Sequence, residues 1–431
     1  MARKMKDSGI EWIGEIPEGW SKNKVIRLFD IIGSGTTPKN ITSDFPVVNW
    51  IQSGDITGSF MPTCKNVISA NLLSQYSALK VYPAPFIIIA MYGASVGNAS
   101  ISLIDGCVNQ ACCVLSSPSC NLHYAFYVIK SAQSYLVRKA VGGGQPNISQ
   151  ETIKQLWLPL PPLSTQDIIV RNLDATCSKI DDLLSSVHAS IEEYKKLKQA
   201  VITQAVTKGV RGEREMKDSG VDYIGQIPAE WVLGKLRNVG DTQNGISKSS
   251  EFFGKGFPFV SYSDVYKNYS LPSTVSGLVD STSEEQKRYS VKKGDIFFTR
   301  TSETIEEVGF SCVCEKDIPN ATFAGFLIRV RPFSDKLYTP YAKYYFRSSH
   351  LRFYLVKEMN LVTRASLGQS LLKSMPVLLP PLEEQKEIAD YLDTKCAEID
   401  KLIAKKEQLV KELDSYKKSL IYEVVTGKRE V

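Results

Sequence analysis

Two Glu-x-Lys pairs are the residues whose types and spacing come closest to a catalytic site. Glu193 with Lys195, and Glu384 with Lys386, have the spacing that nuclease sites use. Metal-assisted cleavage also needs an acidic partner that converges on the pair from a preceding strand, and neither pair has one. Both pairs lie among other Glu, Lys and Asp residues, as expected of a solvated helix face. We therefore interpret them as surface charge and expect no catalytic residue in this chain.

Motifs for other reactions are absent from the sequence. It holds no P-loop, no GxGxxG turn after a strand, no HExxH and no GxSxG. It also lacks the Asn/Asp-Pro-Pro-Tyr tetrapeptide of amino-methyltransferases, so methyl transfer by the chain itself is not expected. The Gly-rich run from Gly142 to Asn147 predicts a hinge rather than a phosphate cradle, since it lies before a proline-rich stop.

The cysteines do not predict a metal site. Cys107, Cys112, Cys113 and Cys120 lie close together in sequence, but no CxxC pair occurs and the 3 histidines are scattered. The total of 9 cysteines is odd and has no regular framework. Such usage fits free thiols in a reducing cytoplasm, which is where we expect the protein.

Composition is that of an ordinary globular protein with no membrane contact. Hydrophobic residues make up 43% of the chain and charged residues 23%. The longest apolar run, Phe86 to Met91, is too short to cross a bilayer, and the opening residues lack the apolar segment of a signal peptide. A formal net charge of +6 permits a polyanionic partner without requiring one.

The elements that must position any site are organised by an internal duplication. The stretch Leu158 to Lys208 returns at Val377 to Lys428 without a gap. Each copy opens with Pro-Pro-Leu, which favours a helix start, and then holds neither Pro nor Gly until Gly209 or Gly427. Duplication of this kind sets the architecture of the whole chain.

Apolar residues in both copies recur in steps of three and four, which is the pattern of a heptad seam. The seams are Leu173, Cys177, Ile180, Leu184, Val187, Ile191, Tyr194, Val201 and Ala205, and then Leu392, Cys396, Ile399, Ile403, Val410, Leu413 and Leu420. They predict two long helices, each roughly 65 Å long at ~1.5 Å per residue, that bury their seams against each other as an antiparallel coiled coil. The alternative is a single exposed amphipathic helix in each place.

A globular block precedes each predicted helix. The leader Met5 to Trp20 returns almost literally at Met216 to Trp231. Behind each leader, short β-branched or aromatic runs predict buried strands, and a Tyr-rich stretch predicts a helical patch. The predicted strands are Phe86–Ala90, Ala111–Leu115, Asp295–Thr299 and Phe326–Val330, and the helical patches are His123–Lys139 and Pro340–Lys357.

These features predict an α+β fold with an internal pseudo-twofold repeat. We expect a globular domain at 1–157, a central long helix at 158–208, a second globular domain at 209–376 and a C-terminal long helix at 377–431. The two blocks have low identity while the helices and leaders are retained. That contrast suggests two readers of different targets on one framework.

Several of these motifs, in this order, resemble the DNA-specificity subunits of type I restriction–modification systems. They are the LPPLxxQ helix starts, the MKDSGxxxIGxIPxxW leaders and the GQPNIS stretch from Gly144 to Ser149. The second half departs from the pattern, because Val362 to Leu367 stands where GQPNIS would be. The local contact made by that motif is therefore in doubt for the second domain.

The resemblance implies both a function and a set of partners. Each globular block would be a target-recognition domain that reads one half of a bipartite, asymmetric site in double-stranded DNA. The helix pair would set the spacer and dock methyltransferase subunits, of which two are expected, and these would bind S-adenosylmethionine to methylate adenine. Restriction and translocation subunits would complete an ATP-dependent endonuclease. The chain itself would hold no cofactor and catalyse nothing.

The loops after the predicted strands supply the candidate DNA-binding residues. Lys and Arg there should contact phosphates, while Arg, Asn, Gln, Ser and Thr read base edges. In the first half the candidates are Gly35, Thr36, Thr37, Lys39, Gln52, Ser53, Tyr92 and Ser95. In the second half they are Gly245, Ser247, Lys248, Tyr262, Ser263, Arg300, Thr301 and Arg364. For each of them the alternative is an ordinary solvated loop residue.

Two other classes of function stay open at this point. One is a self-contained DNA-modification or restriction enzyme with a divergent active site, which the missing methyltransferase tetrapeptide disfavours. The other is a structural coiled-coil scaffold with no nucleic-acid role, which leaves the two divergent globular blocks without a purpose.

Overall fold

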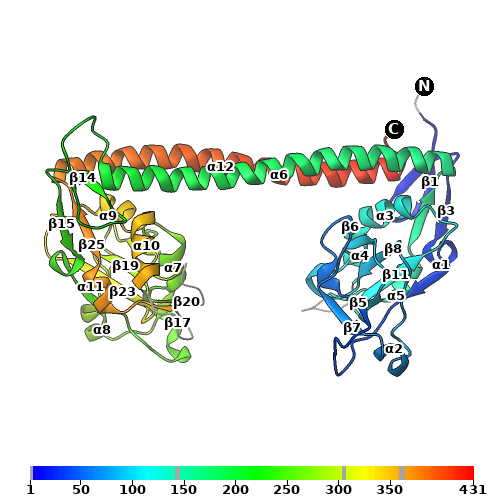
Figure 1. The fold of residues 1–431 in the computed structure, drawn as a ribbon, viewed down its shortest axis with the longest axis horizontal. Helices are drawn as coiled ribbons and strands as arrows, with labels where there is room; N and C mark the ends of the chain where they lie inside the picture. Colours follow the sequence, from blue (N-terminus) through cyan, green and yellow to red (C-terminus); the bar gives the residue numbers. More distant parts are fainter. Residues whose placement is uncertain (1–2, 141–145, 303–306, 359–364) are drawn as a thin grey trace. The chain divides into compact units, whose positions relative to one another are not determined.

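The chain divides into two compact units in a computed structural model that describes residues 3–140, 146–302, 307–358 and 365–431 (Figure 1). Unit 1 comprises 1–187 and 408–431, and unit 2 comprises 188–407. Both unit boundaries fall inside the long helices, so each unit contains the beginning of one helix and the end of the other.

The central sheet of unit 1 is antiparallel except at one edge. Its strand order is β4-β11-β8-β9-β6, with only β6 running parallel to its neighbour. The strands are β4 (Ile31–Gly33), β11 (Cys112–Ser116), β8 (Phe86–Ala90), β9 (Ala99–Ser102) and β6 (Phe60–Met61). A smaller sheet beside it has the order β10-β5-β7, formed by β10 (Cys107–Val108), β5 (Val47–Ile51) and β7 (Asn66–Ser69).

Unit 2 repeats this topology, except that its central sheet has no strand in the place of β6 within the described residues. Its central sheet has the order β16-β23-β19-β21, formed by β16 (Gly240–Asn244), β23 (Leu327–Pro332), β19 (Ile296–Thr299) and β21 (Ser311–Val313). Its smaller sheet has the order β18-β17-β22, formed by β18 (Leu278–Val279), β17 (Phe253–Val260) and β22 (Thr322–Phe323). In both units the long strand of the small sheet has one antiparallel and one parallel neighbour. The predicted internal repeat is therefore confirmed at the level of strand order.

Short strand pairs and helices complete each unit. The strand pairs are β1 (Met5–Ile10) with β2 (Gly14–Pro17) and β3 (Ser21–Lys24) with β12 (Trp157–Leu160) in unit 1, and β13 (Met216–Asp218) with β14 (Gln226–Pro228) and β15 (Val232–Lys235) with β25 (Pro376–Leu379) in unit 2. The helices of unit 1 are α1 (Val25–Leu28), α2 (Leu72–Gln75), α3 (Leu122–Ser131), α4 (Gln133–Arg138) and α5 (Gln150–Lys154). Those of unit 2 are α7 (Tyr262–Lys267), α8 (Ser283–Arg288), α9 (Thr339–Tyr345), α10 (Ser349–Glu358) and α11 (Gln369–Ser374).

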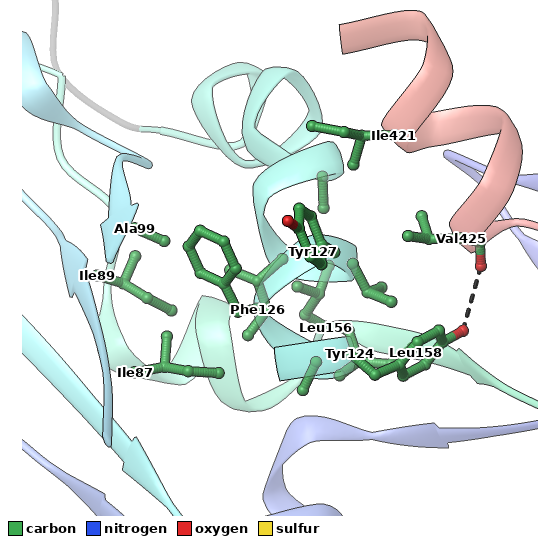
Figure 2. Close-up of a cluster of buried hydrophobic side chains, with 14 of the residues drawn as sticks. Ile87, Ile89, Ala99, Tyr124, Phe126, Tyr127, Leu156, Leu158, Ile421 and Val425 are labelled. Atoms are coloured by element: carbon green, nitrogen blue, oxygen red, sulfur yellow. Dashed lines mark hydrogen bonds between the residues drawn. The ribbon is translucent and has the colours of Figure 1, made fainter. Parts of the chain in front are cut away.

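The middle strand of each central sheet is buried on both faces, as its continuous apolar sequence predicts. In unit 1, Ile87 and Ile89 of β8 face the helical side, where Phe126 of α3 packs on them (Figure 2). Phe86 and Ile88, which point to the opposite face, belong to a second core against the small sheet. Unit 2 divides the side chains of β19 between two cores in the same way.

The two long helices form as predicted, and their ends lie in the cores of the units. Helix α6 spans Leu163–Lys208 and α12 spans Leu382–Val425. Every predicted seam residue is buried or half-buried, which confirms the heptad interpretation. In unit 1, Ile421 and Val425 near the end of α12 join the same core as Phe126 (Figure 2). In unit 2, Ile202 near the end of α6 is fully buried in the equivalent core.

Matching ion pairs show that the helices run antiparallel. Within unit 1, Lys417 of α12 contacts Asp181 of α6 at 2.5 Å. Within unit 2, Lys198 of α6 contacts Asp400 of α12 at 2.7 Å. Because the two lysines occupy equivalent positions in the duplicated stretch, as do the two aspartates, each pair is the pseudo-twofold counterpart of the other. Among the residues described, no helix is long and apolar enough to cross a membrane.

Candidate nucleic-acid interface

In unit 1, a short turn before β11 joins three of the loops that carry candidate residues. We call this turn, Asn109–Ala111, the central turn of unit 1. The backbone N–H of Asn109 donates to the carbonyl oxygen of Ile51 at 3.0 Å, and the carbonyl oxygen of Ala111 accepts from Met91 at 2.7 Å. The Thr37 hydroxyl donates to the amide oxygen of Gln110 at 2.6 Å. The loops after β4, β5 and β8 therefore meet at one turn.

Unit 2 builds the same junction from residues with different side chains. Its central turn is Ala324–Phe326, directly before β23. The N–H of Ala324 donates to the carbonyl of Val260 at 3.0 Å, and the carbonyl of Phe326 accepts from the N–H of Arg300 at 2.8 Å. Gly325 donates to the carbonyl of Ile246 at 2.8 Å. The loops after β16, β17 and β19 converge here, as their counterparts do in unit 1.

Two of the predicted glycines allow this close approach. A Cβ atom on Gly35 would collide with the carbonyl oxygen of Val108, and one on Gly245 would collide with the carbonyl oxygens of Phe323 and Ala324. Any other residue would push the loop off the turn. We therefore assign Gly35 and Gly245 a structural role in bringing the neighbouring loop residues to the site.

A returning segment lies beside the loop after β8 or β19 in both units. In unit 1 the N–H of Ile148 donates to the carbonyl of Met91 at 2.9 Å, and Tyr92 bridges to Asn147. In unit 2 the N–H of Leu367 donates to the carbonyl of Arg300 at 2.7 Å. There, β20 (Thr301–Ser302) pairs with β24 (Ala365–Ser366). The second domain thus places Ala365 to Leu367 beside this loop, as Asn147 and Ile148 lie in unit 1, although the GQPNIS sequence is absent there.

The remaining candidates of unit 1 lie around the central turn and differ in how their backbone is held and in how exposed they are. Thr36 and Lys39 lie in the loop that follows β4, and the backbone N–H of Lys39 donates to the Tyr76 hydroxyl at 3.2 Å. Gln52 directly precedes a 3-10 turn (Ser53–Asp55), and Ser53 begins it. Tyr92 is 39% exposed, and Ser95 ends a second 3-10 turn (Gly93–Ser95).

Three candidates of unit 2 do not lie in free loops. Tyr262 and Ser263 form the first turn of α7, where the ring of Tyr262 stacks on Tyr266 with centroids 5.9 Å apart. Thr301 begins β20. Ser247 is exposed in the loop after β16, and Arg364 lies outside the described residues.

Lys248 has a counterion within its own unit. Its ammonium nitrogen contacts Glu285 of α8 at 2.8 Å and donates to the carbonyl of Asp280 at 2.7 Å. The hydrogen bond from Lys248 lowers the pKa of Glu285, so this carboxylate is charged at neutral pH. A lysine held by a carboxylate has less charge to offer a phosphate than the sequence suggests.

Sequence reasoning missed the side chains of the central turns themselves. Gln110 is exposed beside Thr37, and Phe326 is 64% exposed beside Arg300. Both directly adjoin a predicted buried strand, and the apolar pattern of the sequence includes Phe326 in that strand. A polar or glycine residue just before such a strand was the available signal for a turn at this place.

Buried thiols near the site are not suited to nucleophilic chemistry. Burial raises the pKa of Cys107 to about 11 and that of Cys113 to about 12, so both stay protonated at neutral pH. Across the described ranges, no group of three His, Cys, Asp or Glu side chains is placed to hold a metal ion. What the site does present is hydroxyl, amide and aromatic groups on a backbone fixed by hydrogen bonds, which suits the reading of base edges.

Comparison with known proteins places the chain in a family. Residues 17–193 and again 228–412 match the family described as the type I restriction modification DNA specificity domain. The specificity subunit of the type I restriction enzyme MjaVIII from Methanocaldococcus jannaschii is 28% identical over 72% of this chain and 70% of that protein. The EcoKI specificity subunit from Escherichia coli K12 is 26% identical over 87% of this chain and 82% of its own length.

A solved structure agrees in fold. A chain from a structure that addresses complex assembly and conformational transition of the type I R-M system superposes with a TM-score of 0.72. It has 18% identity, and the match covers 95% of this chain and 98% of that one. Since the family matches both halves of the sequence, the chain belongs to the type I restriction–modification DNA specificity family.

Proposed function

We propose that this chain is the sequence-reading subunit of a type I restriction–modification complex, in which each unit recognises one half of a bipartite, asymmetric site in double-stranded DNA. The observation that carries the proposal is the pair of central turns. One backbone framework presents Gln110 and Ala111 in unit 1 but Gly325 and Phe326 in unit 2. A framework that is kept while its exposed side chains change is what two readers of different base sequences require.

The chain supplies specificity and its partners supply catalysis. Two methyltransferase subunits would bind S-adenosylmethionine and methylate adenine, and restriction and translocation subunits would add ATP-dependent cleavage, all in the cytoplasm. Support for two equivalent docking places comes from exposed apolar residues at matching positions of the duplicated helices. Leu183 of α6 matches Leu402 of α12, and Leu197 matches Tyr416, with exposed fractions between 40% and 54%.

The long helices connect the two readers and set the number of base pairs between the half-sites. Their continuity supports this role, because neither contains a break from Leu163 to Lys208 or from Leu382 to Val425. An insertion of one heptad in both helices would keep the seam in register. It should lengthen the spacer of the recognised site and leave both half-sites unchanged.

A methylome tests the proposal directly. Sequencing of modified bases in the source strain, with and without this gene, should show adenine methylation at one split motif that disappears on deletion. Incubation of the purified chain with labelled S-adenosylmethionine and DNA should give no methyl transfer until partner subunits are added. Transfer by the chain alone would overturn the assignment of catalysis to the partners.

A further inference from the structure

Phe326 is an exposed aromatic ring at the centre of the candidate interface of unit 2. Phe326 is 64% exposed, although it directly precedes β23, whose first residue, Leu327, is fully buried. Phe326 is the last residue of the turn, and its side chain lies at the surface while that of Leu327 lies in the core.

The backbone that carries Phe326 is held on both sides. Its carbonyl oxygen accepts from the N–H of Arg300 at 2.8 Å, and Leu327 donates to the carbonyl of Ala324 at 2.9 Å. Gly325 packs so closely on Ser247 that a Cβ there would collide with the serine hydroxyl. The ring is thus presented from a rigid turn between two of the candidate DNA-binding residues.

Unit 1 carries Ala111 at the position equivalent to Phe326. The carbonyl of Ala111 accepts from Met91 as that of Phe326 does from Arg300, so the two residues are equivalent. The neighbouring Gln110 supplies an exposed amide whose oxygen is held by Thr37. The same turn therefore carries a polar reader in one unit and an apolar one in the other.

Apolar chemistry at a base edge has a specific counterpart. The C5-methyl group of thymine is the apolar group that a base pair exposes in the major groove. Resting on the proposed function, we propose that Phe326 contacts a thymine methyl group in the half-site read by unit 2 and thereby fixes the base at that position. The Gln110 amide would instead select a base by hydrogen bonding in the other half-site.

Substitution of Phe326 tests the inference, and unit 2 offers a matched control. Phe333 lies just beyond the other end of β23 and is 66% exposed. The chain is produced together with its methyltransferase subunits in cells, and the methylated motif is read for the wild type, Phe326→Ala and Phe333→Ala. We expect Phe326→Ala to make one thymine position degenerate in one half-site only, while Phe333→Ala leaves the whole motif unchanged.

Duplexes with uracil in place of thymine test the methyl contact itself. The wild-type complex should bind on the order of tenfold more weakly when one thymine of the second half-site is replaced, in line with the loss from one mismatched pair. Phe326→Ala should show no further loss from that uracil, and Phe326→Leu should restore much of the discrimination. The wild type is measured first, so equal affinity for thymine and uracil overturns the inference even if Phe326→Ala fails to fold.

Each outcome has a separate meaning. An unchanged motif for a folded Phe326→Ala variant, or equal wild-type affinity for thymine and uracil at every position, would overturn the inference and leave the proposed function standing. A wild-type complex that methylates no split motif would overturn the proposed function itself.

Discussion

Tyr124 in unit 1 and Tyr341 in unit 2 make the same two contacts, whereas the central turns of the units differ. The Tyr124 hydroxyl donates to the carbonyl of Pro159 at 2.9 Å and contacts that of Val425 at 3.2 Å (Figure 2). The Tyr341 hydroxyl donates to the carbonyl of Leu378 at 3.2 Å and contacts that of Val206 at 3.4 Å. These tyrosines attach a helical patch both to a strand and to the end of a long helix. The attachment of the helical patch is thus the same in the two units, while the exposed side chains of the central turns differ.

The buried residues around the start of each long helix also differ between the units. In unit 2, the fully buried Glu384 accepts from the indole N–H of Trp231 at 2.9 Å and contacts Arg214 at 2.6 Å. In unit 1, Thr165 precedes Gln166 as Glu384 precedes Gln385, and the indole N–H of the equivalent Trp20 has no hydrogen-bond partner within the described residues. One geometry is therefore stabilised with a buried ion pair in one unit and without it in the other.

The largest effect should come from the helix ends that complete the cores. Ile421 is 2% exposed in unit 1 and its counterpart Ile202 is fully buried in unit 2. Substitution of either by Ala should cost about 4 kcal/mol of the unfolding free energy of the unit that contains it. Hydrogen exchange would locate the loss, in unit 1 for Ile421→Ala and in unit 2 for Ile202→Ala. Leu409→Ala, at an exposed position of α12, serves as the control; lost protection in the opposite unit would contradict the assignment of the helix ends.

Removal of the buried carboxylate should affect unit 2 alone. Glu384→Thr copies the residue of unit 1. It leaves the Trp231 indole without its acceptor and takes from Arg214 its buried carboxylate, while Glu230 stays in contact with Arg214 at 3.1 Å. We expect unit 2 to lose about 3 kcal/mol, because a buried N–H is left unsatisfied and Arg214 loses its buried partner. Thermal unfolding measures the loss, and Glu383→Thr at the neighbouring exposed position should change nothing. If Glu384→Thr also leaves the unfolding temperature unchanged, the stability of unit 2 does not depend on its ion pair. The two helix starts then differ in sequence but not in energy.

Acid should destabilise unit 2 through His350. Burial lowers the pKa of His350 from 6.5 to about 4, so the folded state binds its proton less readily than the unfolded state does. The stability that comes from keeping His350 neutral is fully present above pH 6.5 and is lost as the pH falls towards 4. At pH 5 the loss in unfolding free energy should be about 2 kcal/mol.

Unit 1 supplies the natural control for His350. The residue the same number of positions after Tyr124 as His350 is after Tyr341 is Gln133, which does not titrate. His350→Gln should therefore flatten the decline in the unfolding free energy of unit 2 between pH 7 and pH 5, measured by denaturant titration. An unchanged decline in that variant would assign the acid sensitivity to other groups.

The smallest effect should come from the ion pairs between the long helices. The carboxylates of the Asp181–Lys417 and Asp400–Lys198 pairs are more than half exposed. Double-mutant cycles should give coupling energies of about 1 kcal/mol or less, equal in the two units and weaker in added salt. Clearly unequal couplings would show that the pseudo-twofold relation of the two pairs does not extend to their energetics.

Local pattern and literal repetition were enough to predict the framework from the sequence. The seams of α6 and α12 repeat every three and four residues, so their burial follows from periodicity alone. The runs at Phe86–Ala90 and Ile296–Thr299 are apolar at successive positions, which is the signature of a strand covered on both faces. The leaders and the LPPLxxQ starts are near copies, and therefore predict equivalent halves without any knowledge of how either one folds.

Only the tertiary structure decided which side chains meet at the interface. The contact of Arg300 with Phe326, the pairing of Lys248 with Glu285 and the return of Leu367 to Arg300 join residues far apart in sequence. Such contacts depend on how the sheet twists and where loops cross it, which no local periodicity encodes. For that reason the sequence by itself determined the two repeated globular units and the two long helices, while the fold determined which loop residues lie together in each unit.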